Sequence, residues 1–71
     1  MLRLTPSRLD QLERAVRDGR RVALVRRGTE YIVVARRLET SGRRDALIGM
    51  LPMTGDELTF DLNDLESLEI L

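Results

Sequence analysis

The first part of the chain has the hydrophobic spacing of a helix. Three apolar residues recur at intervals of three and four positions, which places them on one helical face: Leu9, Leu12 and Val16. Thr5 can cap the N-terminus of this helix, and Gly19 can adopt the left-handed conformation that follows a last turn. The pattern therefore predicts a helix over about 6–18, with an apolar face that must pack against other elements.

The middle of the chain has the composition of strands separated by turns. A short apolar run begins at Val22, and a second segment rich in β-branched residues follows Gly28-Thr29. Glycine at the first central position fits a type II′ hairpin between Arg27 and Glu30. Three strands are therefore predicted, over about 20–27, 30–39 and 45–51. Gly49, inside the third strand, indicates a bulge or a sharp bend.

The last fifteen residues, ELTFDLNDLESLEIL, allow two interpretations. As one helix, the segment places Leu58, Leu62 and Leu65 on one face but leaves Phe60 and Ile70 outside it. As two strands, it alternates apolar with polar residues both before and after one tight turn. The turn itself looks like a one-turn cap in which an asparagine is followed three residues later by a glutamate (63–66). The second interpretation accounts for more apolar positions, so we expect strands over about 57–62 and 67–71.

These elements together predict a mainly β fold, a small five-stranded Sm-like or SH3-like barrel with one N-terminal α-helix, in a single domain over residues 1–71. Five short strands that close on themselves would remove most exposed sheet edges. The helix is expected to cover one open end of the barrel.

Composition narrows the possible chemistry. The chain has 71 residues without cysteine or histidine, which excludes disulfides, the usual zinc sites, and catalysis by a thiol or an imidazole. The acidic segment 61–66 is superficially similar to a calcium loop but lacks its central glycine and distant glutamate. Apolar runs are too short to span a membrane. We therefore expect a cytoplasmic protein that is not an enzyme and has neither metal nor cofactor.

Charge is distributed unevenly along the chain. The twelve arginines and five acids of residues 1–44 give a net charge of +7, and the seven acids of residues 45–71 give −7. Arginines near predicted strand ends, together with one tyrosine, could form a basic rim for nucleic-acid phosphates: Arg26, Arg27, Tyr31, Arg36, Arg37, Arg43 and Arg44. Two aromatic residues in the whole chain are few for a binder of single strands. The simpler interpretation is that these arginines keep strand ends soluble and pair with the acidic half of the chain.

Self-association is a further expectation. The apolar chain end, Leu68, Ile70 and Leu71, either packs under the helix or forms an interface. A homo-oligomer or a protein partner is therefore predicted, with nucleic acid as a possible partner.

The order of elements also resembles the WYL domain, a small Sm-like barrel of bacterial regulators. The resemblance covers about residues 9–71 and rests on three segments: LERAVRDGRRVALV, ALIGMLP and ELTFDLNDLESLEIL. Thr59 and Phe60 match the tail of the family. The resemblance implies an Sm-like fold and, from the family's association with the sensing of nucleotides and nucleic-acid fragments, a regulatory role.

The chain departs from this family at its signature positions. Asp45-Ala46-Leu47 stands where the family has Trp-Tyr-Leu, and Leu58, Asp61 and Asp64 stand where it has arginines. Carboxylates supply neither the positive charge nor the donors that a phosphate needs. We therefore expect that the family's usual ligand does not bind at these positions.

Overall fold

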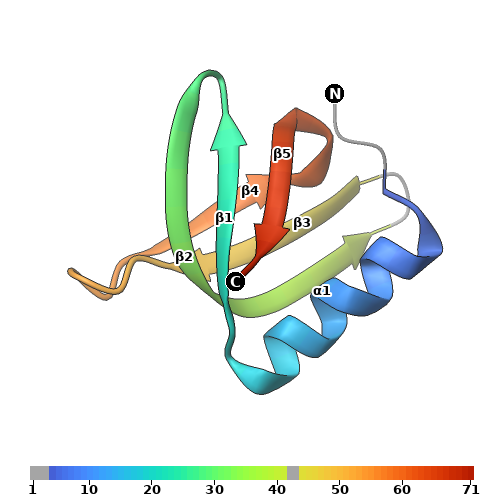
Figure 1. Cartoon of the computed structure of the whole chain (residues 1–71), viewed down its shortest axis with the longest axis horizontal. Coiled ribbons are helices and arrows are strands. Elements are labelled where there is room, and N and C mark those ends of the chain that lie inside the picture. Colours follow the sequence, from blue (N-terminus) through green and yellow to red (C-terminus); the bar gives the residue numbers. More distant parts are fainter. Residues whose placement is uncertain (1–3, 42–43) are drawn as a thin grey trace.

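The computed structural model describes residues 4–41 and 44–71, as one helix and one antiparallel sheet with a 3-10 turn (Figure 1). The elements are, in chain order, α1 (Pro6–Asp18), β1 (Arg21–Arg26), β2 (Thr29–Ser41), β3 (Arg44–Met50), β4 (Glu57–Asp61), η1 (Leu62–Asp64) and β5 (Leu65–Ile70). The mainly β fold class with an N-terminal helix, predicted from the sequence, is confirmed. No helix in the described ranges is long and apolar enough to cross a membrane.

Helix α1 begins and ends where the sequence predicts. The Thr5 hydroxyl accepts a hydrogen bond from the backbone N–H of Arg8 at 3.2 Å, and Gly19 ends the helix with φ 65° and ψ 37°. The hydroxyl pairs a backbone N–H that the helix leaves without a partner at its start. The turn at Gly19 lets the N–H groups of Gly19 and Arg20 pair with carbonyls of the last helical turn. The helix buries Leu12 as expected, and also Ala15.

The hairpin between β1 and β2 differs from the prediction by one residue. Arg26 pairs with Thr29, so the two turn residues are Arg27 and Gly28 rather than Gly28 and Thr29. Both have positive φ, 51° and 76°, as in a type I′ turn and not a type II′ turn. Type I′ geometry matches the twist of the strands, and the Glu66 carboxylate accepts a hydrogen bond from the Gly28 N–H at 2.9 Å. These factors outweigh the cost of a left-handed arginine.

Strand β2 bends sharply opposite Gly49. The pairing with β3 shifts between Ala35 and Arg37, so Arg36 is the extra residue of a bulge. A Cβ on Gly49 would lie 2.4 Å from Cγ2 of Val33, so only glycine lets the two strands approach this closely. The predicted irregularity is confirmed at Gly49, although its extra residue lies in the neighbouring strand.

The tail folds as two strands around a single 3-10 turn, which confirms the strand interpretation. Phe60 and Leu62 are buried before and within the turn, and Leu65 and Leu68 are buried after it. The predicted cap at Asn63 is wrong. Asp61 caps the turn instead, because its carboxylate accepts a hydrogen bond from the Asn63 N–H at 2.9 Å.

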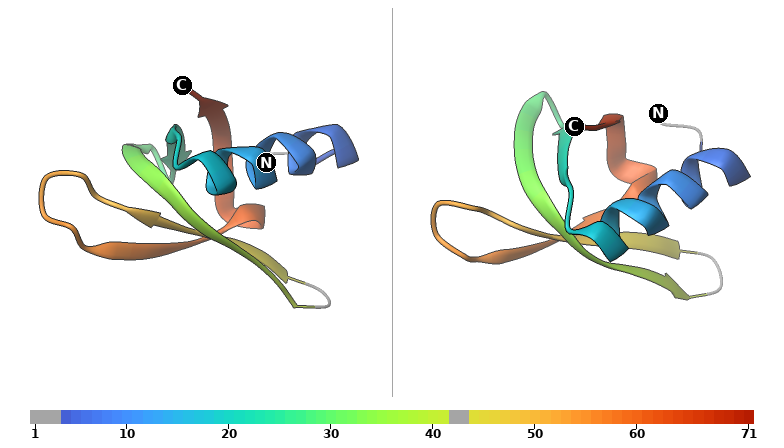
Figure 2. Two further views of the ribbon diagram at one scale, coloured as in Figure 1. Left: turned by 90° about the horizontal axis from the view of Figure 1, so that it is seen from below. Right: turned by 60° about the horizontal axis from the view of Figure 1, so that its bottom comes forward.

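The sheet has the order β4-β3-β2-β1-β5 and curls around one hydrophobic core. Helix α1 lies across the core from the β3–β4 hairpin, as Figure 2 shows, and contributes Leu12 and Ala15 to it. In the described part of the chain, β4 and β5 are not paired with each other, because they are the two ends of the sheet. The expectation that the strands close and remove most edges is therefore wrong at these two strands.

Candidate functional site

An open groove of about 420 Å³ lies between the C-terminal end of α1 and the bend of β2. Its lining brings together three arginines and two acids: Arg17, Arg36, Arg37, Asp18 and Glu57. The β2 bulge places two consecutive arginines here, since the extra residue changes the direction of the side chains that follow it. This groove is the place where part of the predicted arginine rim meets the helix.

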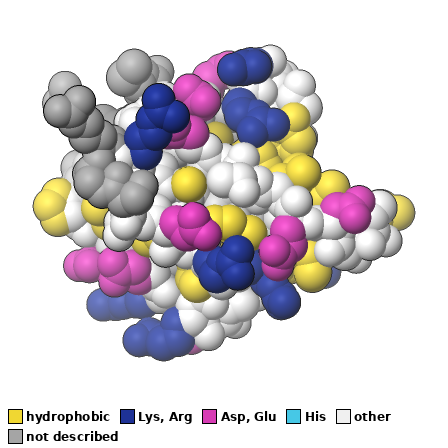
Figure 3. All heavy atoms as spheres, turned by 180° about the vertical axis from the view of Figure 1, so that it is seen from behind, with side chains coloured by type: hydrophobic (Ala, Val, Ile, Leu, Met, Phe, Trp, Pro, Cys, Tyr) yellow, Lys and Arg dark blue, Asp and Glu magenta, His cyan; other side chains and the backbone are white. Residues whose placement is uncertain are grey.

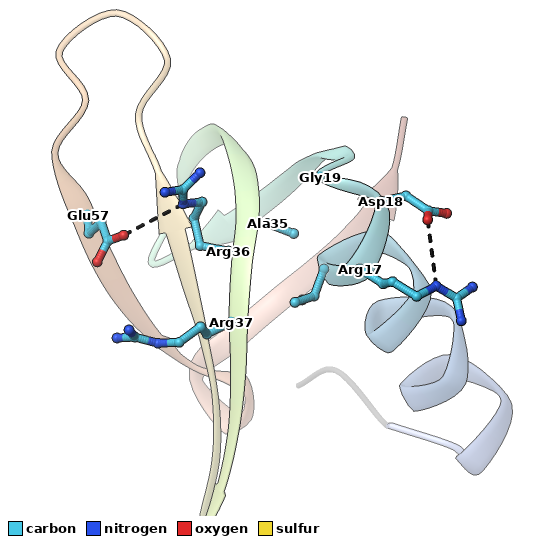
Figure 4. A pocket seen from close by; sticks show the side chains of 8 residues that line it. Arg17, Asp18, Gly19, Ala35, Arg36, Arg37 and Glu57 are labelled. Carbon is cyan, nitrogen blue, oxygen red and sulfur yellow. Dashed lines mark ion pairs between the residues drawn. The ribbon is translucent and has the colours of Figure 1, made fainter.

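The guanidinium groups of this groove do not converge on a common point. Figure 4 shows that Arg36 and Arg37 extend away from α1, whereas Arg17 extends on the opposite side of the groove. Arg17 lies 3.6 Å from Asp18 and Arg36 lies 3.7 Å from Glu57. A phosphate held by several donors requires them to point at it together. The groove therefore lacks the geometry of a preformed phosphate site.

Arg26, another residue of the predicted rim, packs on two aromatic rings instead of pairing with an acid. Its guanidinium carbon lies 4.9 Å from the ring centre of Phe60 and 5.2 Å from that of Tyr31. The two rings meet edge to face at 5.2 Å, and Phe60 is fully buried. Cation–π and aromatic contacts of this kind stabilise a packed cluster. Both Arg26 and Tyr31, predicted as nucleic-acid contacts, therefore serve in closing the core.

The predicted arginine rim is distributed over separate parts of the molecule. Arg27 is at the β1–β2 turn, and Arg36 and Arg37 are at the β2 bend. Arg44 begins β3 and pairs with Ser41 at the other end of β2. Arg43 lies outside the described residues. Seen from behind, acidic and basic side chains alternate over the surface instead of forming one basic field (Figure 3). That side of the molecule therefore lacks the continuous positive stripe that a phosphate chain follows.

The positions that correspond to the WYL ligand residues also do not converge. Asp45 and Ala46 lie in β3, where Ala46 pairs with Asp61 of β4. Three of the other positions have different environments. Leu47 is fully buried, Leu58 packs against the core, and Asp64 is exposed on the 3-10 turn. These six residues form a packed sheet segment and its acidic margin.

The two sheet edges carry features that hinder pairing with another chain. The N–H of Leu71 donates to the Arg21 carbonyl, so alternate β5 residues turn their backbone groups away from β1. On that outward side Arg8 Nη2 donates to the Leu68 carbonyl at 2.6 Å. β4 is only five residues long and carries acids at both ends, Glu57 and Asp61. Short, charged and covered edges are the usual protection against edge pairing.

The outer face of β1 and β2 is an apolar surface that helix α1 leaves open. We use this name for Ala23, Val25, Ile32 and Val34, which alternate with core residues along the two strands. Ile32 is 45% exposed and the other three are half-buried. Helix α1 packs on the inner side with the core, so it does not cover this face. Alternation along the strands separates the two sides of the sheet, but it does not show which side helix α1 leaves uncovered.

Two further apolar side chains lie near the outer face. Met50 of β3 pairs with Val34 and is half-buried. Leu71, which follows β5, is 48% exposed. Its backbone N–H donates a hydrogen bond to the carbonyl of Arg21 in β1. The apolar surface therefore extends across β1, β2 and β3, and Arg21 and Glu69 separate it from Leu71.

Comparison of the chain with models of protein families gave no match, and neither did comparison with curated proteins. The resemblance to the WYL domain stays a prediction.

Proposed function

We propose that this protein is a non-catalytic interaction module that binds protein through the outer face of β1 and β2. The observation that carries the proposal is the 45% exposure of Ile32 at the centre of a surface of β-branched and other apolar side chains. Burying the exposed part of one such side chain contributes on the order of 1 kcal/mol. Several of them buried together give a protein contact its central apolar area.

The chemistry of the described residues favours contact over catalysis. The groove at the β2 bend is open, and its charged groups are exposed and paired with one another. An active site usually combines a concave, mostly apolar pocket with convergent polar groups. A regulatory role of the kind that the WYL resemblance implies would be exerted by this contact, without the ligand of that family. The cytoplasmic location stays a prediction.

A photo-crosslinking residue in place of Ile32 tests the proposal in the cell. We expect covalent protein adducts from position 32, detected by gel shift and identified by mass spectrometry. The matched control places the same residue at Thr54, which is also exposed but lies in the β3–β4 loop. Adducts no more abundant at position 32 than at position 54 would refute the assignment of this face.

Binding of nucleic acid through the arginine rim is the alternative that the sequence left open. The dispersal of these arginines, and the packing of Arg26 on two rings, do not favour it. We therefore treat it as an outcome to be excluded by experiment.

A further inference from the structure

We infer that the partner of the outer face is a second copy of this chain, related by a two-fold axis that passes between Ile32 and Val34. The inference rests on the proposed function and names its partner. The argument concerns charge, because the apolar side chains alone do not select one occupant.

Opposite charges flank the apolar surface at successive positions along the strands. Arg21 of β1 pairs with Val34 of β2. Two residues further along β1, Ala23 pairs with Glu69 of β5. Arg21 and Glu69 are exposed, and neither side chain forms an ion pair with another residue in 4–41 or 44–71. The free charges of this face are therefore available to a partner.

A two-fold axis makes this arrangement complementary to itself. In such an interface both copies use the same surface in opposite directions. An axis lying in the contact plane and crossing the strands between Ile32 and Val34 places the Ala23–Ile32 row against the partner's Arg21–Val34 row. Ile32 of each copy then meets Val34 of the other, and Glu69 of each copy lies next to Arg21 of the other. Each favourable contact occurs twice.

The orientation of the axis decides which charges meet. An axis running along β2 would place Glu30 of one copy against Glu30 of the other, and like charges across a contact repel each other. The axis that crosses the strands brings Arg21 of each copy next to Glu69 of the other instead.

Edge pairing between copies is the other way in which small β folds associate, and it does not fit this chain. Joining β4 of one copy to β5 of another would bring the acids Glu57 and Asp61 close to Glu69 and Ser67, with no base in either strand. It would also displace Arg8 from the Leu68 carbonyl.

Charge reversal tests the dimer by sedimentation velocity on purified protein. We expect the native chain to sediment as a dimer, and Arg21→Glu and Glu69→Arg each to weaken the dimer on the order of tenfold, since each change introduces two repulsive contacts. Mixing the two variants should restore the dimer, because each contact of the mixed dimer again joins one acidic and one basic side chain. The control Arg14→Glu makes the same charge change on exposed α1 and should leave the dimer unchanged.

Folding of each variant is checked by circular dichroism, and Ile32→Arg offers an independent route if one charge variant unfolds. Ile32→Arg should give a folded monomer. A native chain that stays monomeric at high concentration overturns the inference, as does a mixture that fails to re-form the dimer. Adducts from position 32 to a different protein, combined with a monomeric native chain, would leave the proposed function standing and remove only the second copy as partner.

Discussion

Arg27 and Gly28, at the tip of the β1–β2 hairpin, both have a left-handed backbone conformation, and only Gly28 adopts this conformation without strain. Gly28 has no Cβ, whereas Arg27 at φ 51° brings its Cβ close to the backbone carbonyl that follows. The strain is held in place by the type I′ twist and by the hydrogen bond from Gly28 to Glu66. Arg27 is thus tolerated at a position where asparagine is preferred.

Replacing Arg27 with Asn is expected to stabilise the protein by up to about 1 kcal/mol, because Asn-Gly is the preferred type I′ sequence. Urea denaturation followed by circular dichroism measures the change as a higher midpoint with an unchanged slope. The companion variant Gly28→Ala should lower stability by about 1 kcal/mol, since its φ is 76°. A lower midpoint for Arg27→Asn would mean that the arginine side chain stabilises the hairpin through a contact.

At the scale of elements, β2 is the strand that shapes the sheet. Its first half pairs with β1 and its second half with β3, and the bulge at Arg36 lies where the two halves meet. The bend is possible because Gly49 allows Val33 to come within the space that a side chain would fill. One glycine therefore controls how tightly the sheet curls around the core.

Gly49→Ala is expected to destabilise the protein by about 1–3 kcal/mol, the usual cost of forcing an extra carbon into a packed core. A double-mutant cycle with Val33→Ala, measured by denaturation, identifies the cause. In that background Gly49→Ala should cost less, with a coupling of at least about 0.5 kcal/mol, because the Cγ atom at 2.4 Å is gone. Additive effects would show that the Cγ atoms of Val33 do not cause the loss, and would leave its Cβ atom, 2.8 Å from the added carbon, as the cause.

For the whole molecule, the basic first part and the acidic last part do not form two separate fields. Arg36 and Glu57 join them at 3.7 Å, and the Glu66 carboxylate reaches back to the β1–β2 turn. Exposed pairs of this kind contribute little stability, typically below about 1 kcal/mol each. Their effect is to interrupt any continuous basic surface.

We accordingly expect the native chain to give no mobility shift with single-stranded RNA or DNA at low salt, up to about 10 μM protein, within the range where non-specific binders act. The control variant combines Asp18→Asn with Glu57→Gln, which frees Arg17 and Arg36 from their partners. Any binding should appear first in that variant. A salt-sensitive shift with the native chain would restore the arginine rim as the functional site.

Local signals in the sequence were sufficient for the helix and the strands. Thr5 and Gly19 mark the helix by hydrogen bonding and left-handed geometry, and the alternation of apolar and polar residues distinguished two strands from one helix in the tail. The hairpin register was not determined locally, because Gly28 has positive φ in either turn and the choice depends on Glu66, far along the chain. Ala15 was missed in the core because its small side chain gives little hydrophobic signal.

The candidate sites depended on contacts that no local pattern contains. The direction of Arg36 follows from the bulge and from an acid two strands away. The packing of Arg26 on Tyr31 and Phe60 joins the β1–β2 hairpin to a residue of β4 that is far along the chain. That the outer face of β1 and β2 is uncovered follows from the side of the sheet to which α1 docks.

The sheet order also sets a sequence of events during folding. Strands β1 to β4 can zip together between immediate neighbours, but β1 receives its second partner only from β5, the last strand. Closing so long a loop is entropically costly and slow compared with forming hairpins. One flank of β1 therefore stays unpaired on the nascent chain until β5 has been synthesised.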